Sequence, residues 1–231
     1  MDVNAFIAGL QAGASSGGSG GGGADVLNSI IDRSITEIES DATSIGSHAF
    51  DGCSYLITAN FPKATIIGGQ AFYGCSKMTS VEAPNATEIG TQAFSSNHLL
   101  TRVCFPGVTS FPYGAFFDCM RLESVDNSKA TSIASQAFAY CSSLKAVILR
   151  SESLCKLSNK DAFNYCYHIL GTQNGSYNPN GSKDGYFYVP SALVNSYKSA
   201  TNWSTYASQF RALEDYTVDG TITGELDPNK I

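Results

Sequence analysis

The fold is decided by the stretch IGSHAFDGCSYL, at residues 45–56, because the chain repeats it. The phrase returns as IGGQAFYGCSKM (67–78), IGTQAFSSNHLL (89–100), FPYGAFFDCMRL (111–122) and IASQAFAYCSSL (133–144). Its phenylalanine recurs every 22 residues, and once more after a gap of 25, at Phe50, Phe72, Phe94, Phe116, Phe138 and Phe163. A fixed period of about 20 to 29 residues predicts a solenoid in which each unit buries its apolar side chains against the next.

Aligned, the units read Leu-x-x-Val-x-x-Pro-x-Ala-Thr-x-Ile-x-x-x-Ala-Phe-x-x-Cys-x-x-Leu. We expect a first strand around Ala59, Val81, Val103, Val125 and Val147. A turn should follow at Pro62, Pro84 and Pro106, which Ser128 and Arg150 later replace, since proline cannot donate to a ladder. A second extended piece should hold Ile67, Ile89, Phe111 and Ile133, and the Ala-Phe pair should begin a tight helical or turn segment.

The same register turns single residues into columns that run through the molecule. We expect a structural column of phenylalanines, named above, and a second column at Cys53, Cys75, Asn97, Cys119, Cys141 and Cys166. Metal ligands must converge on one point, whereas a column spreads them along an axis, so we expect no metal site there. Asn97 supports a structural role, because an amide can hydrogen-bond the backbone that a weak S–H group would meet.

The motif IGxxAFxxCxxL resembles the BspA-like family of leucine-rich repeats, over residues 45 to about 169. The resemblance implies a β-rich right-handed solenoid with two short parallel β-ladders per turn and a small helical C-terminal cap. It also implies adhesion or recognition rather than catalysis. The chain departs from the pattern at Asn97, at Phe111, and at three extra residues within LRSESLCKLSNKDAF.

The segments outside the repeats divide the rest of the chain. We expect a short amphipathic helix at 1–13, a Gly/Ser linker at 14–24, an N-terminal cap with a helix-like start at 25–44, and the solenoid at 45–169. An irregular loop at 170–186, a C-terminal cap at 187–217 and an acidic tail at 218–231 should follow. The first helix is either a frayed terminus or a docking element, and a homo-oligomer formed through residues 2–13 would use it.

The C-terminal segment from Tyr186 onward looks like a closing domain of repeat proteins from gut Firmicutes and their prophages. Its residues predict a strand at Tyr186 to Val189, a helix after Pro190, and a second helix with Trp203, Tyr206 and Phe210.

The composition of the chain argues against two classes of binding partner. A net charge of −6 without a basic cluster argues against nucleic acid and against an anionic membrane. The first basic residue is Arg33, and no apolar run approaches the roughly 20 residues of a membrane span, so we expect no signal peptide and no membrane insertion. A cytoplasmic or virion-associated protein is favoured over a classically secreted one. Seven cysteines, an odd number, fit a reducing compartment.

No arrangement of side chains predicts catalysis, and we expect neither an enzyme nor a cofactor. His48, His98 and His168 fall at different offsets within the unit, so they form no column and no triad. Cys104 occupies a slot filled elsewhere by polar residues, and we expect it to face outward.

Two surfaces remain as candidates for binding a protein or a surface glycan. The loop contributes Tyr177, Asn178 and Tyr186, in a composition typical of adaptable paratopes. Aromatic residues near the turns contribute Tyr55, Tyr73, Phe117, Tyr140, Tyr165 and Tyr167. We therefore expect a non-enzymatic recognition or adhesion module, on a phage tail or a bacterial surface, with an intracellular protein–protein scaffold or assembly subunit as the alternative.

Overall fold

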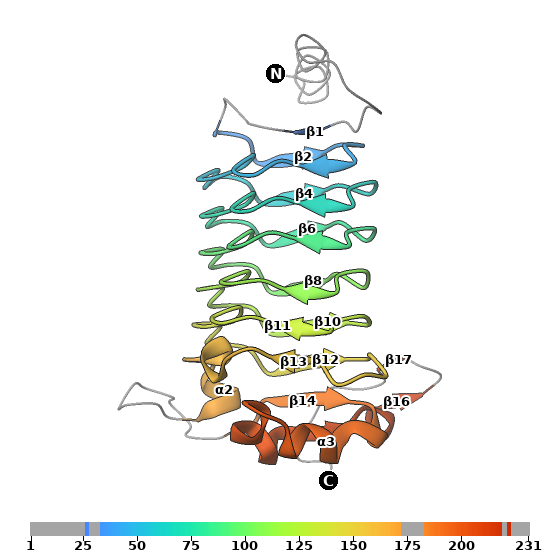
Figure 1. The fold of residues 1–231 in the computed structure, drawn as a ribbon. Helices are drawn as coiled ribbons and strands as arrows, with labels where there is room; N and C mark the ends of the chain where they lie inside the picture. The colour runs from blue at the N-terminus through green and yellow to red at the C-terminus, as the bar shows by residue number, and fades with distance from the viewer. Residues whose placement is uncertain (1–25, 28–32, 172–182, 219–220, 223–231) are drawn as a thin grey trace.

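The computed structural model describes residues 26–27, 33–171, 183–218 and 221–222. Over these residues the chain winds into successive turns that are stacked along one axis (Figure 1). The predicted helix at 1–13, the linker at 14–24, most of the acidic tail, and the loop residues Tyr177 and Asn178 lie outside the described residues. No helix in the described part is long and apolar enough to span a bilayer.

The first ladder consists of parallel strands whose central residues face the core. It forms two sheets, with the strand orders β2-β4-β6 and β15-β14-β12-β10-β8. The strands are β2 (Glu37–Glu39), β4 (Thr58–Asn60), β6 (Ser80–Glu82), β8 (Arg102–Cys104), β10 (Ser124–Asn127), β12 (Ala146–Leu149), β14 (Tyr186–Val189) and β15 (Phe210–Ala212). The predicted first strand is thus confirmed, since Ala59 pairs with Val81, and Val103 with Val125.

The second ladder has two-residue strands that also pair in parallel. Its strands are β1 (Val26–Leu27), β3 (Ser44–Ile45), β5 (Ile66–Ile67), β7 (Glu88–Ile89), β9 (Ser110–Phe111), β11 (Ser132–Ile133) and β13 (Lys156–Leu157). The second residue of β5, β7, β9 and β11 is the predicted apolar residue of that slot, and it is buried in each case. Both ladders follow the alternation of strand side chains between core and solvent.

The third side of each turn is the segment that starts at the Ala-Phe pair, which we call the turn edge. In the first five repeats it is built of hydrogen-bonded turns, and in the sixth the Ala-Phe pair ends a short 3-10 helix. The phenylalanine N–H donates to the alanine carbonyl one repeat further on, as from Phe50 to Ala71 (2.7 Å) and from Phe94 to Ala115 (2.9 Å). The repeats are therefore joined by backbone hydrogen bonds on all three sides.

Stacked phenylalanine rings fill the core. From Phe50 to Phe163, successive ring centroids lie 4.9–5.5 Å apart, and their planes differ by 6° at most. All six side chains are fully buried. At about 1.5–3 kcal/mol for each buried ring, this column is a major source of stability.

The N-terminal end differs from the sequence prediction. Val26 and Leu27, in the segment expected to be helix-like, form β1 and pair with β3. β2 and the first residue of β3 lie inside the expected cap at 25–44, yet the two strands continue both ladders in register with β4 and β5. The stack therefore begins before residue 45, because Ile38 and Ile45 already fill the buried slots of a complete turn.

The C-terminal cap extends the first ladder and closes the core. The sixth repeat contributes η1 (Lys160–Phe163) and α2 (Tyr167–Leu170). The helical pieces of the cap are η2 (Ser191–Leu193), α3 (Val194–Ser199), η3 (Trp203–Gln209) and η4 (Leu213–Tyr216), followed by a hairpin of β16 (Thr217–Val218) and β17 (Thr221–Ile222). The strand predicted at Tyr186–Val189 is present as β14. Phe210 was expected in a helix, but it begins β15, because its ring and backbone pair with Phe187 of β14.

Candidate functional site

The histidines of the described residues occur in separate pairs with aspartate. The described residues contain no cluster of three His, Cys, Asp or Glu side chains suited to a metal ion. Each histidine faces a single aspartate instead: His48 faces Asp51, His98 faces Asp118 and His168 faces Asp184. These pairs lie at separate places along the stack.

The cysteine column is part of the structural framework. Cys75, Cys119, Cys141 and Cys166 are buried, and each thiol donates to a phenylalanine carbonyl of the preceding repeat at 3.1–3.2 Å. Burial raises the pKa of all four thiols well above the ordinary value. Such thiols stay protonated at neutral pH, and their short side chains serve as hydrogen-bond donors.

Asn97 takes the place of a cysteine in this column. Its Nδ2 donates to the carbonyl of Phe72 at 2.9 Å and to that of Phe94 at 2.7 Å. Its Oδ1 is buried and has no hydrogen-bond partner among the described residues. The amide therefore reproduces the thiol's bond and leaves one polar atom unsatisfied.

Cys104 faces outward, as predicted, on the outer side of the first ladder. Partial burial, followed by the negative charge of Asp126, raises the pKa of its thiol, while Arg102 and Arg150 act in the opposite direction. A thiol held in this form is a weak nucleophile.

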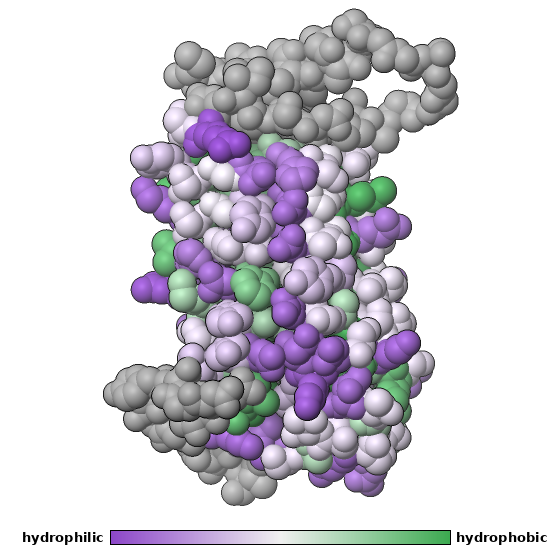
Figure 2. Space-filling view, turned by 60° about the vertical axis from the view of Figure 1, so that its left-hand side comes forward, coloured by the Kyte–Doolittle hydropathy of each residue, from purple (hydrophilic) through white to green (hydrophobic). Residues whose placement is uncertain are grey.

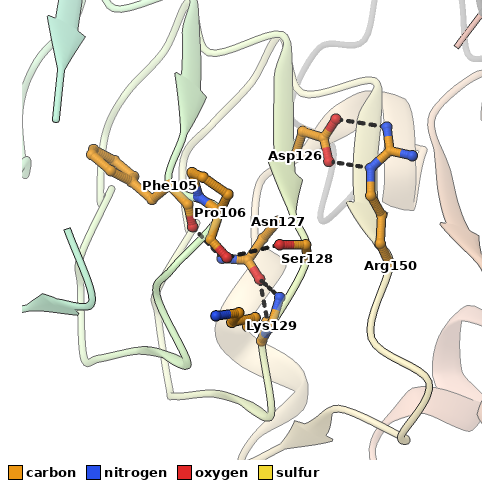
Figure 3. A network of polar contacts seen from close by, with 8 residues as sticks. Phe105, Pro106, Asp126, Asn127, Ser128, Lys129 and Arg150 are labelled. Carbon is orange, nitrogen blue, oxygen red and sulfur yellow. Dashed lines mark hydrogen bonds and ion pairs between the residues drawn. The ribbon is translucent and has the colours of Figure 1, made fainter. Parts of the chain in front are cut away.

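A polar network next to Cys104 fixes the turn after β10, where Ser128 stands in the position that proline occupies in earlier repeats. Asn127 is buried and donates to the carbonyls of Phe105 (2.7 Å) and Val108 (2.9 Å), while its Oδ1 accepts two backbone N–H groups (Figure 3). Asp126 and Arg150 form a two-pronged ion pair with both distances at 2.9 Å. These contacts fix the turn and join two repeats. We therefore assign them a structural role and not a role in binding.

The outer side of the first ladder is open only over its N-terminal part. On β2 to β10 its outward positions are polar and at least partly exposed, at Glu37, Glu39, Thr58, Asn60, Ser80, Glu82, Arg102, Cys104, Ser124 and Asp126. On β12 and β14 the equivalent residues form a separate buried cluster with Leu213. The C-terminal segment thus covers the last two strands of this face.

One predicted binding residue, Tyr186, is buried under this C-terminal segment. Tyr186 is only 9 % exposed, because it packs in the cluster with Leu213 and lies under the guanidinium of Arg211, 4.1 Å from the ring centroid. Tyr186 is therefore part of the cap packing. Tyr177 and Asn178, predicted with it, lie outside the described residues.

The predicted aromatic residues near the turns do not form one continuous surface. Tyr55, 54 % exposed, stands near the N-terminal end with the Lys77 ammonium 4.4 Å from its ring centroid. Tyr73 is half-buried, and Ser95 replaces the aromatic residue in the next repeat. The predicted candidates thus divide into an N-terminal pair and a C-terminal group.

The C-terminal group forms a row along the turn edge. Phe117 contacts Tyr140 with ring centroids 5.1 Å apart, and Tyr140 stacks on Tyr165 at 4.3 Å. We call these three residues the aromatic row. Tyr167, in α2, lies near enough to influence the ionisation of Tyr140. Figure 2 brings this edge forward and shows its hydrophobic groups separated by polar and neutral residues.

The backbone under the aromatic row is unusual for bulky residues. One slot of the turn edge is left-handed in all six repeats, with φ between 60° and 70°, at Gly52, Gly74, Ser96, Asp118, Tyr140 and Tyr165. Glycine adopts this conformation freely, whereas other L-residues are destabilised there by roughly 1–2 kcal/mol. The first two repeats carry the residue that suits the backbone, and the last two carry tyrosine.

Polar groups adjoin the aromatic row. Asp118 precedes Tyr140 in the left-handed slot, and its Oδ2 lies 3.1 Å from Nε2 of His98. The pKa of Tyr140 is raised, first by partial desolvation, then by a hydrogen bond with Tyr165, and further by the negative charge of Asp118. Met120, 41 % exposed, lies on the same edge.

Sequence reasoning identified these aromatic residues but not the strain beneath them. The signal was present in the repeat alignment, where Gly-Gly-Ser-Asp-Tyr-Tyr occupies one slot. A slot that begins with glycine twice predicts a left-handed backbone, and tyrosine is out of place there. The pairing of His98 with Asp118 was not visible, because it joins two repeats at different offsets.

The architecture defines the class of protein before any comparison. Turns of about 22 residues, two parallel ladders and a buried Leu/Ile/Phe core make a leucine-rich repeat solenoid. Residues 31–145 match, in six copies, the family described as BspA type leucine rich repeat region. The chain belongs to this family. Among curated proteins, none matches the sequence significantly.

Several solved bacterial structures are similar. The T. pallidum leucine rich repeat protein is 26 % identical with a TM-score of 0.49, over 62 % of this chain and 75 % of that one. A leucine-rich repeat protein from Bacteroides ovatus is 27 % identical with a TM-score of 0.43, over 53 % of this chain and 35 % of that one. A leucine rich cell surface protein from Faecalibacterium prausnitzii is 20 % identical with a TM-score of 0.48, over 76 % and 51 %. The chain thus spans about a third and about half of the last two proteins.

Proposed function

We propose that this chain is a non-enzymatic recognition module whose turn edge binds a protein or glycan on a cell surface. The repeats supply a rigid support, since hydrogen bonds join them on three sides and the phenylalanine column fixes their spacing. The aromatic row supplies the contact. Phage tails and bacterial surfaces are both settings in which such a module would act.

One observation carries this proposal. Tyr140 and Tyr165 occupy a left-handed slot that glycine fills in the first two repeats, and Tyr140 remains 39 % exposed. Residues in sparsely populated backbone conformations cluster at binding and active sites, and here the strain coincides with an exposed aromatic ring. Because the repeat would close at least as well with glycine, the tyrosines are kept for contact with a partner.

A binding experiment on intact bacterial cells tests the proposal. The labelled chain should bind cells or a purified envelope fraction of at least one species in a panel, and Tyr140→Gly should weaken that binding at least tenfold. Ser96→Gly is the matched control, because it relieves the same backbone slot without removing an aromatic ring. Binding that persists in Tyr140→Gly, or no binding to any cell or envelope, would contradict the proposal, and a soluble protein partner instead would favour the scaffold alternative.

We further propose that residues 2–13 mediate self-association. Light scattering of the intact chain and of a version without residues 1–24 measures this directly. A closed oligomer that becomes a monomer on truncation supports the proposal, and two monomers contradict it.

A further inference from the structure

We propose that the aromatic row binds an uncharged, hydroxyl-rich carbohydrate chain that lies across Phe117, Tyr140 and Tyr165. This inference rests on the proposed recognition function and names the chemical class of its ligand. It is carried by the geometry of the rings, by the polar groups beside them and by the local charge.

The three rings of the row meet at different angles. Tyr140 and Tyr165 are nearly parallel, with 16° between their planes, so their facing sides cover each other. Phe117 is inclined by 58° to Tyr140, so it meets that ring at an angle instead of stacking face to face. The C–H groups of a sugar ring carry partial positive charge and pack on the negative face of an aromatic ring. Because the row crosses three repeats, it suits an extended chain better than a single small molecule.

The polar neighbours match hydroxyl groups, which both donate and accept. The Asp118 carboxylate accepts hydrogen bonds, and its side chain is 30 % exposed. His98, 38 % exposed and 3.1 Å from Asp118, holds this carboxylate in place beside the row. The phenols of Tyr140 and Tyr165 share a hydrogen bond with each other, and their oxygens can also accept from a ligand. A few convergent polar groups next to an apolar platform are typical of small-ligand sites.

The charge of this region argues for a neutral ligand. The Asp118 carboxylate places a negative charge close enough to Tyr140 to help raise its pKa. A phosphorylated or carboxylated chain would be repelled, since such ligands require a cluster of basic side chains. A basic peptide would have to compete with His98, which already pairs with the Asp118 carboxylate beside the row.

The chain itself supplies matched variants for the test. Tyr140→Gly restores the residue found at Gly52 and Gly74, so the repeat should still close. Its lost ring contacts and its relieved backbone should largely offset each other in stability. Ser96→Gly changes the same slot two repeats away and leaves the row intact. Tyr55→Ala removes the most exposed tyrosine among the described residues but lies outside the row.

Affinity electrophoresis of the full chain in native gels provides the measurement. The gels contain a soluble β-glucan, a mannan or a galactomannan, with hyaluronate and polysialic acid as anionic counterparts. At least one neutral polysaccharide should retard the chain, and its dissociation constant should rise at least tenfold in Tyr140→Gly but stay within twofold in Ser96→Gly and Tyr55→Ala. The anionic polymers should cause no retardation.

The outcomes separate this inference from the proposed function. If the chain binds cells through Tyr140 but no neutral polysaccharide retards it, the ligand class is wrong and the recognition function stands. Retardation that survives Tyr140→Gly would place the glycan elsewhere and overturn the inference. Retardation only by the anionic polymers would also overturn it, and failure to bind both cells and polysaccharides would remove both proposals.

Discussion

The phenolic oxygen of Tyr197 accepts the backbone N–H of Cys155 at 2.9 Å, across 42 residues of sequence. The indole of Trp203 donates to the carbonyl of the same residue at 2.6 Å. Cys155 directly precedes β13, the last strand of the second ladder. Two cap side chains thus satisfy both backbone groups at the point where no further repeat follows. The cap ends the ladder with side chains instead of another strand.

Tyr197→Phe should lower the free energy of unfolding by about 1–3 kcal/mol, because the Cys155 N–H would be left buried without a partner. The ring packing against Trp203 and Phe210 is retained, so the change isolates the hydrogen bond. Urea unfolding followed by circular dichroism measures it. Tyr55→Phe, at an exposed ring, is the control and should change nothing. Equal stability of the two variants would contradict the closing role of Tyr197.

Asn97→Cys should stabilise the fold by about 1 kcal/mol. The new thiol would donate to the Phe72 carbonyl as its neighbours in the column do, and the buried unpartnered Oδ1 of Asn97 would be removed. Asn97→Ala is the comparison, because it removes the amide donor as well and should destabilise. Thermal unfolding of both variants measures the difference in stability. A cysteine variant as unstable as the alanine variant would refute the view that Asn97 stands in for a column cysteine.

The repeat units were predictable because every unit states the same pattern. Most inward slots are apolar in nearly every unit, so the strand positions and the phenylalanine column follow from the period alone. Asn127 shows the limit of this reasoning. It occupies the buried slot of Phe61 and Phe105, and only the contacts of the folded turn explain how its amide is satisfied there.

Segments that occur once were harder to interpret. Phe210 was assigned to a helix from its spacing with Trp203 and Tyr206, but pairing with β14 places it in a strand. Tertiary pairing overrides local propensity in such short segments. The aromatic row was visible as a set of residues, whereas its strain depends on φ angles that only the repeat alignment and the structure together reveal.

Phe94→Ala should cost about 3–5 kcal/mol, in the range of large-to-small substitutions in tight cores. Phe94 is fully buried and contacts Phe72, Phe116 and Phe105, so neighbouring rings on both sides lose a partner. Denaturant unfolding gives the value. Phe117→Ala is a useful comparison, because this half-buried ring lies outside the column and should cost much less. An unchanged midpoint for Phe94→Ala would show that the phenylalanine column does not hold the repeats together.

Cys104 should be the cysteine that an alkylating reagent modifies in the folded protein. The other six thiols are buried, whereas Cys104 is exposed. Iodoacetamide at pH 8 followed by mass spectrometry should show one adduct per chain, formed slowly because the Cys104 pKa is raised. Cys104→Ser should show none until urea is added. Rapid modification of a column cysteine would mean that the repeats open locally.

Stability should fall as the pH rises above about 8.5. Burial raises the pKa of Cys155 to about 12 and that of Tyr197 to about 12, and it also raises the pKa of Cys75, Cys119 and Cys166. Below the ordinary thiol pKa of about 8.5 both folded and unfolded chains hold these protons, so the pH has no effect through them. Above it the unfolded chain releases them and the folded chain keeps them. Each thiol then lowers the free energy of unfolding by up to about 1.4 kcal/mol per pH unit, until its folded pKa is reached.

Urea midpoints measured in steps from pH 7 to pH 11 check this dependence. The midpoint should stay level up to about pH 8.5 and then drop steeply, because several thiols act together. Cys155→Ala removes one contributor and should flatten the fall, whereas Cys104→Ser should leave it nearly unchanged, since that thiol is exposed. A midpoint that stays constant to pH 11 would show that the column cysteines ionise in the folded chain. The repeats would then hold together without the S–H donors that link each turn to the one before.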